Sequence, residues 1–253
     1  MPDDIEKKID QIIDSLPNLT KGQIYWVEQI IESFKSIHEF KVLDSKLISE
    51  DILKDFGYAL LIHHTFSNEP FSKDKFEYVL VRILEMHDVN SGHAPRGNPG
   101  HDITINDTKV SLKTQADRNI KEDYLWISKF MELGKGNWGD NPMDLTLLLD
   151  QFLTHLQNYD RILILRALSK EPTWHYELVE IPIELLREAE NGELEMKIES
   201  VQFPKPGYCY VKGSDDELKY QLYFDGGSER KLQIKSLDKK FCRVHCELKF
   251  TID

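Results

Sequence analysis

The sequence predicts an α/β protein: a mixed central sheet flanked by helices, with N-terminal helices before it and a β-rich region after it. The run RILILRAL at 161–168 is continuously apolar, as expected of a strand that helices cover on both faces. An alternating hairpin pattern lies ahead of this run, and an alternating strand and a short helical pattern follow it. This order of elements places the α/β core at about 70–190.

We therefore expect three regions within one compact domain: N-terminal helices at 1–69, the core at 70–190 and a β-rich extension at 191–253. In the first region, isoleucines recur at helical spacing before Leu16-Pro17. Two further helices are predicted at about 21–40 and 49–64.

A fourth helix is predicted for SKDKFEYVLVRILEMH, with Ser72 as its N-cap. Glu77 stands beside its apolar stripe and could point toward whatever the helix packs on. A Gly- and Pro-rich loop then leads to the stretch GHDITINDTKVSLKTQ, residues 100–115.

The stretch 100–115 predicts a hairpin that turns at Asn106-Asp107. Two pairs follow, Ile103 with Val110 and Ile105 with Thr108, and Asp102 comes to lie opposite Ser111. Alternation puts the apolar side chains on one face, and on the other the polar set Asp102, Thr104, Lys109, Ser111 and Lys113.

After the hairpin, we expect a short helix at about 122–133, a loop with a basic and an aromatic residue at its tip, and an amphipathic helix from Pro142 to Tyr159. The strand at 161–168, the strand WHYELVEIP and a helix at about 183–190 complete the core. The short β segments beyond residue 200 either extend the sheet or form a small β subdomain.

Composition bounds the function. The chain has 253 residues and a net charge of −12, so as a whole it should repel nucleic acid, and any polyanion must be held by a local patch or a metal. The apolar runs are shorter than the roughly 20 residues of a membrane span, and the N-terminus is acidic, so we expect no membrane and a cytoplasmic location. Three sparse cysteines fit a reducing compartment.

Two chemistries are disfavoured. Cys242 and Cys246 share a strand face while His245 points the other way, which argues against a zinc site that would also use Cys209. No GxSxG motif is present, and the i, i+2 spacing of Ser111 and Lys113 suggests side chains about 6 to 7 Å apart, too far for a Ser-Lys hydrolase.

Metal-dependent phosphodiester hydrolysis fits better. It needs a carboxylate for an oxygen-ligating ion such as Mg²⁺, and a cation that holds the attacking water and stabilises developing negative charge. Asp102 and Lys113 supply these on one face of one hairpin.

Residues 70–170 resemble the PD-(D/E)XK nuclease core of type II restriction endonucleases. The resemblance makes Asp102 a metal ligand and Lys113 the catalytic lysine. It departs from the family pattern in two ways: Pro99 is three residues from Asp102, and Ser111 stands where an acidic residue is usual. Some family members with Ser there recruit a Glu from a helix, so we expect Glu77 to complete the metal site, with Glu122 as the alternative.

The implied protein is a Mg²⁺-dependent, sequence-specific double-stranded DNA endonuclease that leaves a 5′-phosphate. Because a palindrome has two-fold symmetry, we expect a homodimer. Side chains able to contact DNA are Gln115, Arg118, Asn119, Lys121, Lys135, Asn137 and Trp138. Two alternatives remain: an inactive nucleic-acid-binding module with the nuclease fold, which Ser111 makes possible, and an α/β scaffold whose hairpin is only structural.

Overall fold

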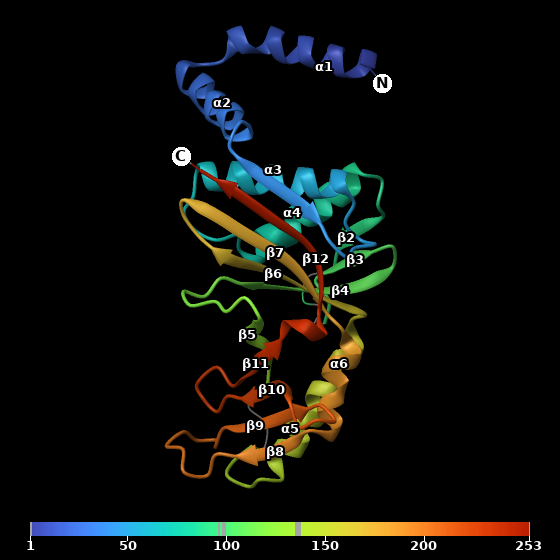
Figure 1. Ribbon diagram of the computed structural model, residues 1–253, viewed down its shortest axis with the longest axis vertical. Helices are drawn as coiled ribbons and strands as arrows, with labels where there is room; N and C mark the ends of the chain where they lie inside the picture. The colour runs from blue at the N-terminus through green and yellow to red at the C-terminus, as the bar shows by residue number, and fades with distance from the viewer. Residues whose placement is uncertain (1, 96, 98–99, 135–137, 253) are drawn as a thin grey trace.

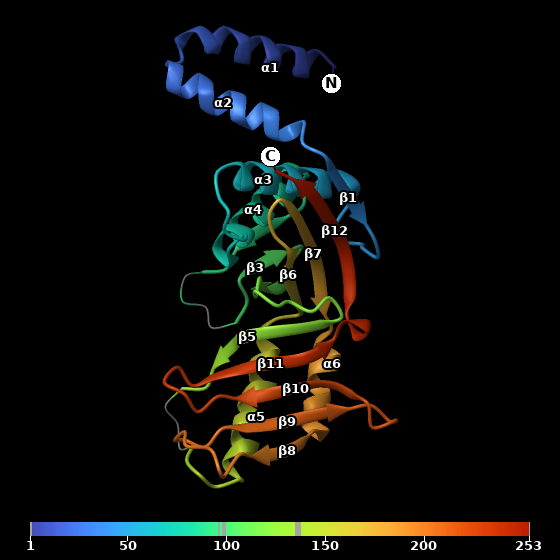
Figure 2. The same cartoon turned by 60° about the vertical axis from the view of Figure 1, so that its left-hand side comes forward.

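The strands form two sheets. The structure, a computed structural model, describes residues 2–95, 97, 100–134 and 138–252. The larger sheet has the order β1-β12-β7-β6-β4-β3-β2 (Figures 1 and 2). Its β4–β6 pair is parallel and its other pairs are antiparallel, so the mixed sheet is confirmed. The strands are β1 (His38–Val42), β2 (Ser91–His93), β3 (Ile103–Ile105), β4 (Thr108–Gln115), β6 (Arg161–Ser169), β7 (Thr173–Ile181) and β12 (Arg243–Thr251).

The second sheet is antiparallel and lies below the first in both views (Figures 1 and 2). Its strands, in spatial order, are β5 (Tyr124–Glu132), β11 (Lys231–Asp238), β10 (Leu218–Phe224), β9 (Gly207–Lys212) and β8 (Glu193–Met196). The two alternatives for the C-terminal segments therefore both apply. Strands β8 to β11 build the second sheet with β5, whereas β12 returns to the first sheet beside β7.

Six α-helices accompany the sheets in the described part of the chain. They are α1 (Pro2–Ser15), α2 (Lys21–Phe34), α3 (Glu50–Thr65), α4 (Lys73–Met86), α5 (Asp144–His155) and α6 (Ile183–Arg187). Short 3₁₀ turns lie at Leu16–Asn18, Leu156–Asn158, Glu188–Asn191 and Lys239–Phe241. Helices α3 and α4 cover one face of the larger sheet, and α5 lies along the second sheet (Figures 1 and 2).

Strand β6 separates two hydrophobic cores. Ile162 and Ile164 belong to the core shared with α5 and the second sheet. Leu163 and Leu165, which alternate with them, belong to the core under α3 and α4. All four are at most 1% exposed, so the prediction of a strand buried on both faces is confirmed.

Two helix predictions are wrong in part or whole. The segment predicted as a helix at 122–133 is strand β5, which pairs with β11. Its first four residues alternate between exposed and buried, and its aromatic and branched side chains favour a sheet once a partner strand is present. The helix predicted at 21–40 ends at Phe34, and His38–Val42 forms β1 on the edge of the sheet.

The hairpin is confirmed in its register. Ile103 pairs with Val110 and Ile105 with Thr108. The turn residues Asn106 and Asp107 have φ of 48° and 63°, the left-handed conformation that a two-residue type I′ turn requires. Asp102 directly precedes β3, and its N–H donates to the Val110 carbonyl at 2.9 Å.

The larger sheet thus combines the hairpin with β6 and rests its apolar face on α4. None of the helices in the described ranges is long and apolar enough to cross a membrane.

Candidate active site

The Asp102 carboxylate is held by three donors. Its Oδ2 accepts from the Leu112 N–H at 2.6 Å and from Ser111 Oγ at 3.3 Å. Its Oδ1 accepts from Lys73 Nζ at 2.6 Å. The carboxylate sits at the head of β3, where the hairpin fixes its backbone, and its side chain remains 17% exposed. Asp102 is therefore oriented by β4 and paired with a cation from α4.

Lys113 extends this chain of contacts. Its Nζ donates to Ser111 Oγ at 3.1 Å and lies 5.5 Å from the centre of the Phe130 ring. Burial lowers the pKa of Lys113 to about 8, although Asp102 raises it, and Lys73 adds to the lowering. Lys73, Asp102, Ser111 and Lys113 form one continuous polar cluster, which we call the Asp102 cluster.

The predicted separation of about 6 to 7 Å between the side chains of Ser111 and Lys113 is wrong. The long Lys113 side chain folds back along the strand and reaches Ser111 Oγ. Ser111 still makes a poor nucleophile, because it is 1% exposed and its hydroxyl is directed at Asp102. The serine instead connects the carboxylate and the ammonium.

The Asp102 cluster opens into a cavity of about 590 Å³. Asp102, Lys113 and Lys73 form one wall. The other wall comes from β5, from α5 and from the 3₁₀ turn that follows it, with the polar side chains Gln151, His155 and Asn158. The cavity is therefore a cleft between the larger sheet and the second sheet, and a substrate there would touch both.

Aromatic rings line the floor beside this wall. His155 lies 5.5 Å from Tyr159 and 6.1 Å from Phe130 between ring centres. Burial, and then the charge of Lys113, lower the pKa of His155, so its ring is neutral near pH 7. The Tyr159 side chain is 3% exposed, and its hydroxyl has no hydrogen-bond partner among the described residues. Burial also raises the pKa of Tyr159.

Sequence reasoning missed Lys73 and His155. A signal existed for Lys73, which is the first residue after the Ser72 N-cap and so lies at the helix end nearest the hairpin. His155 carried none, because it comes from a helix more than 40 residues beyond Lys113 and joins the site through the packing of α5.

Neither candidate glutamate lines the cleft beside Asp102. Glu77 is one turn beyond Lys73 on α4, and its Oε1 accepts from His93 Nδ1 at 3.1 Å. Glu122 is exposed, and its carbonyl accepts from Arg166 at 3.1 Å, at the far end of β4. Of the two, Glu77 is on the helix that already contacts Asp102.

The donor set suits an oxygen-ligating divalent cation. Asp102 supplies a carboxylate that already faces a cation, the Lys73 ammonium, and Ser111 adds a hydroxyl. Within the described ranges, no group of three or more His, Cys, Asp or Glu side chains could hold a metal. Magnesium keeps several waters and uses one or two carboxylates with substrate phosphates, so a lean site of this kind fits it. The three cysteines are free.

A second cluster lies further along β4, where this strand pairs with β6. Arg166 on β6 donates to Glu177 and, at 3.0 Å, to Gln115 Oε1. It also donates to the carbonyls of Lys121, Glu122 and Tyr124 at 2.6, 3.1 and 2.8 Å. Arg166 and Glu177 are both 0% exposed. This Arg166 cluster fixes the segment between β4 and β5.

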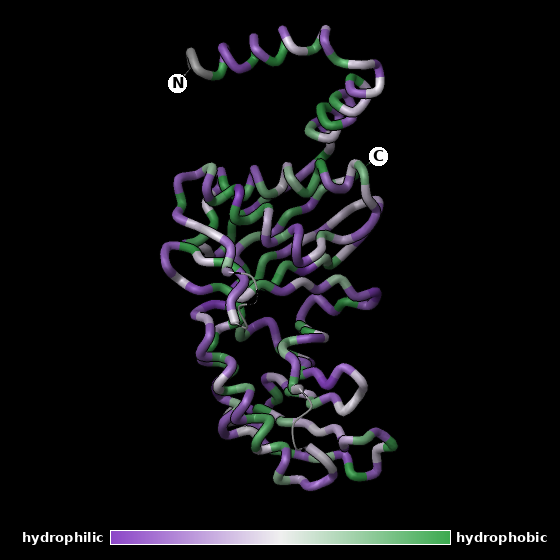
Figure 3. The backbone as a smooth tube through the Cα atoms, turned by 180° about the vertical axis from the view of Figure 1, so that it is seen from behind, coloured by the Kyte–Doolittle hydropathy of each residue, from purple (hydrophilic) through white to green (hydrophobic). Residues whose placement is uncertain are grey.

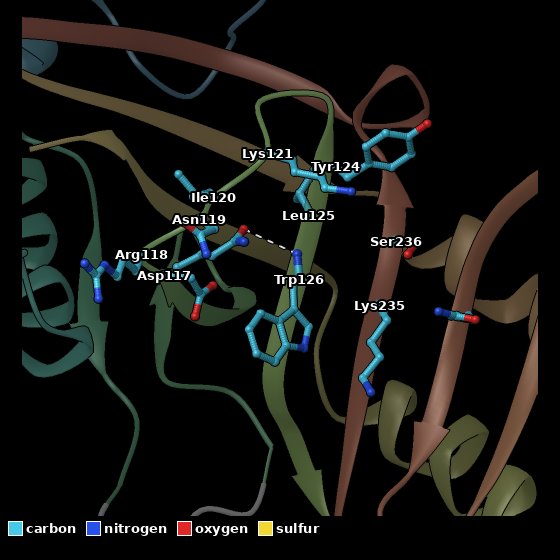
Figure 4. A pocket seen from close by; sticks show the side chains of 12 residues that line it. Asp117, Arg118, Asn119, Ile120, Lys121, Tyr124, Leu125, Trp126, Lys235 and Ser236 are labelled. Carbon is cyan, nitrogen blue, oxygen red and sulfur yellow. Dashed lines mark hydrogen bonds between the residues drawn. The ribbon is translucent and has the colours of Figure 1, made fainter. Parts of the chain in front are cut away.

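That segment forms a second cavity, of about 660 Å³ (Figure 4). Gln115, Arg118, Asn119 and Lys121, which we predicted to contact DNA, lie in its lining with Trp126 and Lys235. Gln115 is only 5% exposed, and its amide oxygen also accepts from the backbone N–H of Trp126 at 3.3 Å. Gln115 therefore supports the cavity, and the exposed Arg118, Asn119 and Lys121 are available to a ligand.

The other predicted DNA contacts differ. Trp138 is 6% exposed, and its indole N–H donates to the Lys205 carbonyl at 2.9 Å, so it belongs to the core and not to the surface we expected. Lys135 and Asn137 lie outside the described residues.

The chain is similar to type II restriction enzymes. A family model described as SmaI, type II site-specific deoxyribonuclease, matches residues 12–250. The type II restriction enzyme SmaI of Serratia marcescens is 45% identical over 217 residues, which cover 85% of this chain and 86% of that enzyme. No solved structure matches the chain.

Proposed function

Because this chain belongs to the SmaI family of type II site-specific deoxyribonucleases, we propose that it cleaves DNA at the Asp102 cluster with the help of Mg²⁺. Membership makes the chain a sequence-specific DNA endonuclease, and it confirms the predicted type II restriction function. The proposal adds the location of the chemistry, the metal and the roles of individual residues.

One observation carries the location. Lys73, Asp102, Ser111 and Lys113 are joined by contacts of 2.6 to 3.3 Å at the wall of a cleft between the two sheets. A carboxylate between two ammonium groups can hold a divalent cation and still present positive charge to a phosphate. The cleft also gives the DNA backbone access from solvent.

In this proposal Mg²⁺, when bound, neutralises phosphate charge and lowers the pKa of a coordinated water. Asp102 is its carboxylate ligand, held in orientation by the Leu112 N–H and Ser111 Oγ. Lys113 orients the attacking water and stabilises the charge that develops on the phosphate oxygens. The new P–O bond forms as the bond to the 3′ oxygen breaks, which leaves a 5′-phosphate and a 3′-hydroxyl.

Lys73 has a role that the sequence did not suggest. Its ammonium lies 2.6 Å from Asp102 Oδ1 and is 40% exposed at the mouth of the cleft. A divalent cation on Asp102 would compete with Lys73 for this oxygen. Lys73 would then turn toward a phosphate oxygen of the DNA, so that one side chain serves as counter-ion without metal and as a phosphate contact with it.

Glu77 is proposed as the second acidic group. It is four residues after Lys73 and therefore on the same side of α4, adjacent to the side chain that reaches Asp102. To approach the metal it must leave His93, whose side chain is 41% exposed. Glu122 remains the alternative, but its segment is tied to Arg166.

Sequence recognition is proposed for the second cavity. Arg118 and Asn119 can form paired hydrogen bonds with base edges, and Lys121 can contact the backbone. The segment that carries them is held at both ends by Arg166 and Gln115, so a rigid support presents them to DNA. Two copies of the chain, related by a two-fold axis, would place one catalytic cleft on each strand of a symmetric site.

Plasmid cleavage tests the proposal. The protein should cut mixed-sequence plasmid DNA into discrete fragments with Mg²⁺, and Lys113→Ala should abolish cutting while DNA binding, measured by gel shift in Ca²⁺, is retained. Lys109→Ala is a matched control, since Lys109 lies on the same face of β4 and outside the cleft lining. Full cleavage by Lys113→Ala would refute the assigned role.

The second acidic group needs its own variants. Glu77→Gln should lose cleavage and bind DNA normally, whereas Glu122→Gln should cut at the wild-type rate. The reverse pattern would transfer the role to Glu122. DNA binding without cutting under every metal condition would favour the inactive module.

A further inference from the structure

Helices α1 and α2 project from the body of the molecule at the end opposite the second sheet (Figures 1 and 2). We call these two helices the arm. Along both, hydrophobic residues alternate with hydrophilic ones, visible as green and purple in Figure 3. The apolar side chains are largely exposed: Ile5 62%, Ile9 49%, Ile12 59%, Ile13 55%, Ile24 47%, Tyr25 50%, Trp26 54%, Ile31 50% and Phe34 40%.

The arm touches the body on one side of α2 only, among the residues described. Trp26 lies 5.3 Å from Phe66, and Phe34 lies 5.5 Å from Tyr58, between ring centres. Ile24 and Ile31, seven residues apart, face another side of the helix. The isoleucines of α1 share one stripe at positions 5, 9, 12 and 13. The stripe of α1 and the outer side of α2 are therefore uncovered.

This area is large enough for a stable interface. A half-exposed apolar side chain of this size presents roughly 100 Å², so the seven that remain when Trp26 and Phe34 are left out present on the order of 700 Å² together. A specific protein interface buries about 800 Å² on each partner. Monomers rarely expose apolar patches above a few hundred Å². A partner is thus expected to cover the arm.

Charge narrows the choice of partner. Residues 2–34 contain seven acidic and three basic side chains, a net charge of −4. An acidic arm repels DNA, and it also differs from the basic helices that bind anionic membranes. Of the partners considered for the arm, this leaves a protein that presents an apolar helical face. Under the proposed function each chain carries one Asp102 cluster and two chains cleave the two strands of duplex DNA, so a second copy is the partner that the activity itself requires.

We propose that the arms of two copies pack together and form the homodimer interface. The inference rests on the proposed two-fold arrangement, and it adds the surface that creates it. Under two-fold symmetry the α1 stripe of one protomer meets the arm of its partner, and the four helices bury their isoleucines in a small bundle.

Sedimentation velocity over a wide concentration range tests the surface. Ile12→Asp places a charge in the stripe and should weaken self-association about 100-fold or more. Gln11→Asp adds the same charge on the opposite side of α1 and should leave the dimer intact. A monomeric wild-type protein, or equal dimerisation of the two variants, would overturn the proposal.

Cross-linking covers the case in which Ile12→Asp unfolds the arm. With a short bis-maleimide, Ile12→Cys should give a covalent dimer and Gln11→Cys should not, and equal yields would contradict the interface. Cleavage separates this inference from the proposed chemistry. Asp102→Ala should dimerise without cutting. Ile12→Asp should convert plasmid mainly to nicked circles, because a monomer carries one Asp102 cluster and cuts one DNA strand at a time.

Discussion

The Asp102 and Arg166 clusters share strand β4 and the same face of the larger sheet, yet they differ in one property. Gln115 is the register partner of Arg166, and Lys113 lies two residues before Gln115. In the Arg166 cluster, Arg166 and Glu177 are completely buried, and contacts saturate the guanidinium. In the Asp102 cluster, the carboxylate and Lys73 are partly exposed at a cleft.

The difference in exposure indicates that the charged groups have different roles in the two clusters. A buried, fully paired cluster holds backbone in position, and its removal costs folding free energy. A cluster that is paired but reaches solvent can exchange a partner for a metal or a phosphate. Accessible volume beside the charges, rather than the residue types, separates catalysis from support here.

The largest effect should come from Asp102→Asn. The amide keeps an acceptor for the Leu112 N–H but loses the charge that would bind a divalent cation, so single-turnover cleavage should fall about 1,000-fold or more. The free energy of unfolding, measured by urea denaturation, should change by less than about 1 kcal/mol, since the carboxylate is partly exposed. A loss of several kcal/mol in the free energy of unfolding would give Asp102 the same supporting role as the Arg166 cluster and contradict the distinction between the two.

Glu177→Gln should have the opposite profile. It leaves Arg166 and Lys239, whose Nζ lies 3.1 Å from Glu177 Oε2, without their counter-ion. The free energy of unfolding, measured by urea denaturation, should fall by about 3 to 5 kcal/mol. Cleavage per folded molecule, measured below the unfolding transition, should stay within a few-fold of wild type. A selective loss of cleavage with normal stability would contradict a supporting role.

A third cluster lies around Glu180 on β7, whose side chain is 15% exposed, close to the 17% of Asp102. Burial would raise the pKa of Glu180, but hydrogen bonds from His245 and Arg161 outweigh it and lower the pKa to about 2. Ionised Glu180 therefore stabilises the fold above its unfolded pKa near 4.5, and this stabilisation disappears as the pH falls toward 2. Its size is on the order of 2 to 3 kcal/mol.

Unfolding free energies measured by urea at pH 5 and pH 3 check this. The difference should shrink in Glu180→Gln, which cannot titrate, whereas Glu184→Gln, an exposed glutamate, should retain the wild-type slope. An identical slope in all three proteins would exclude Glu180 as the source.

The smallest effect should come from Tyr159→Phe. The Tyr159 hydroxyl is buried without a partner among the described side chains, which costs folding free energy, so the variant should be as stable as wild type or more stable by up to about 1 kcal/mol. Cleavage should change less than about threefold. A large loss of cleavage would show that this hydroxyl contacts the substrate and acts together with the Asp102 cluster.

Local sequence patterns determined much of the fold. Alternation set the hairpin register, and Asn106 and Asp107 adopt the turn that it required. The apolar run at 161–168 identified the central strand, because only burial on both faces explains the absence of alternation. Asp102 and Lys113 were found together because a two-residue turn determines which side chains share a face.

Tertiary structure alone decided the rest. Strand β5 depends on a partner, β11, that is about 100 residues away, so its local pattern could not distinguish a strand from a helix. Lys73 and His155 reach the cleft through the packing of α4 and α5, which no spacing in the sequence encodes. The sequence determined which polar side chains share one face of the hairpin, because these residues are close together in the chain. The packing of distant elements then made that hairpin one wall of a cleft.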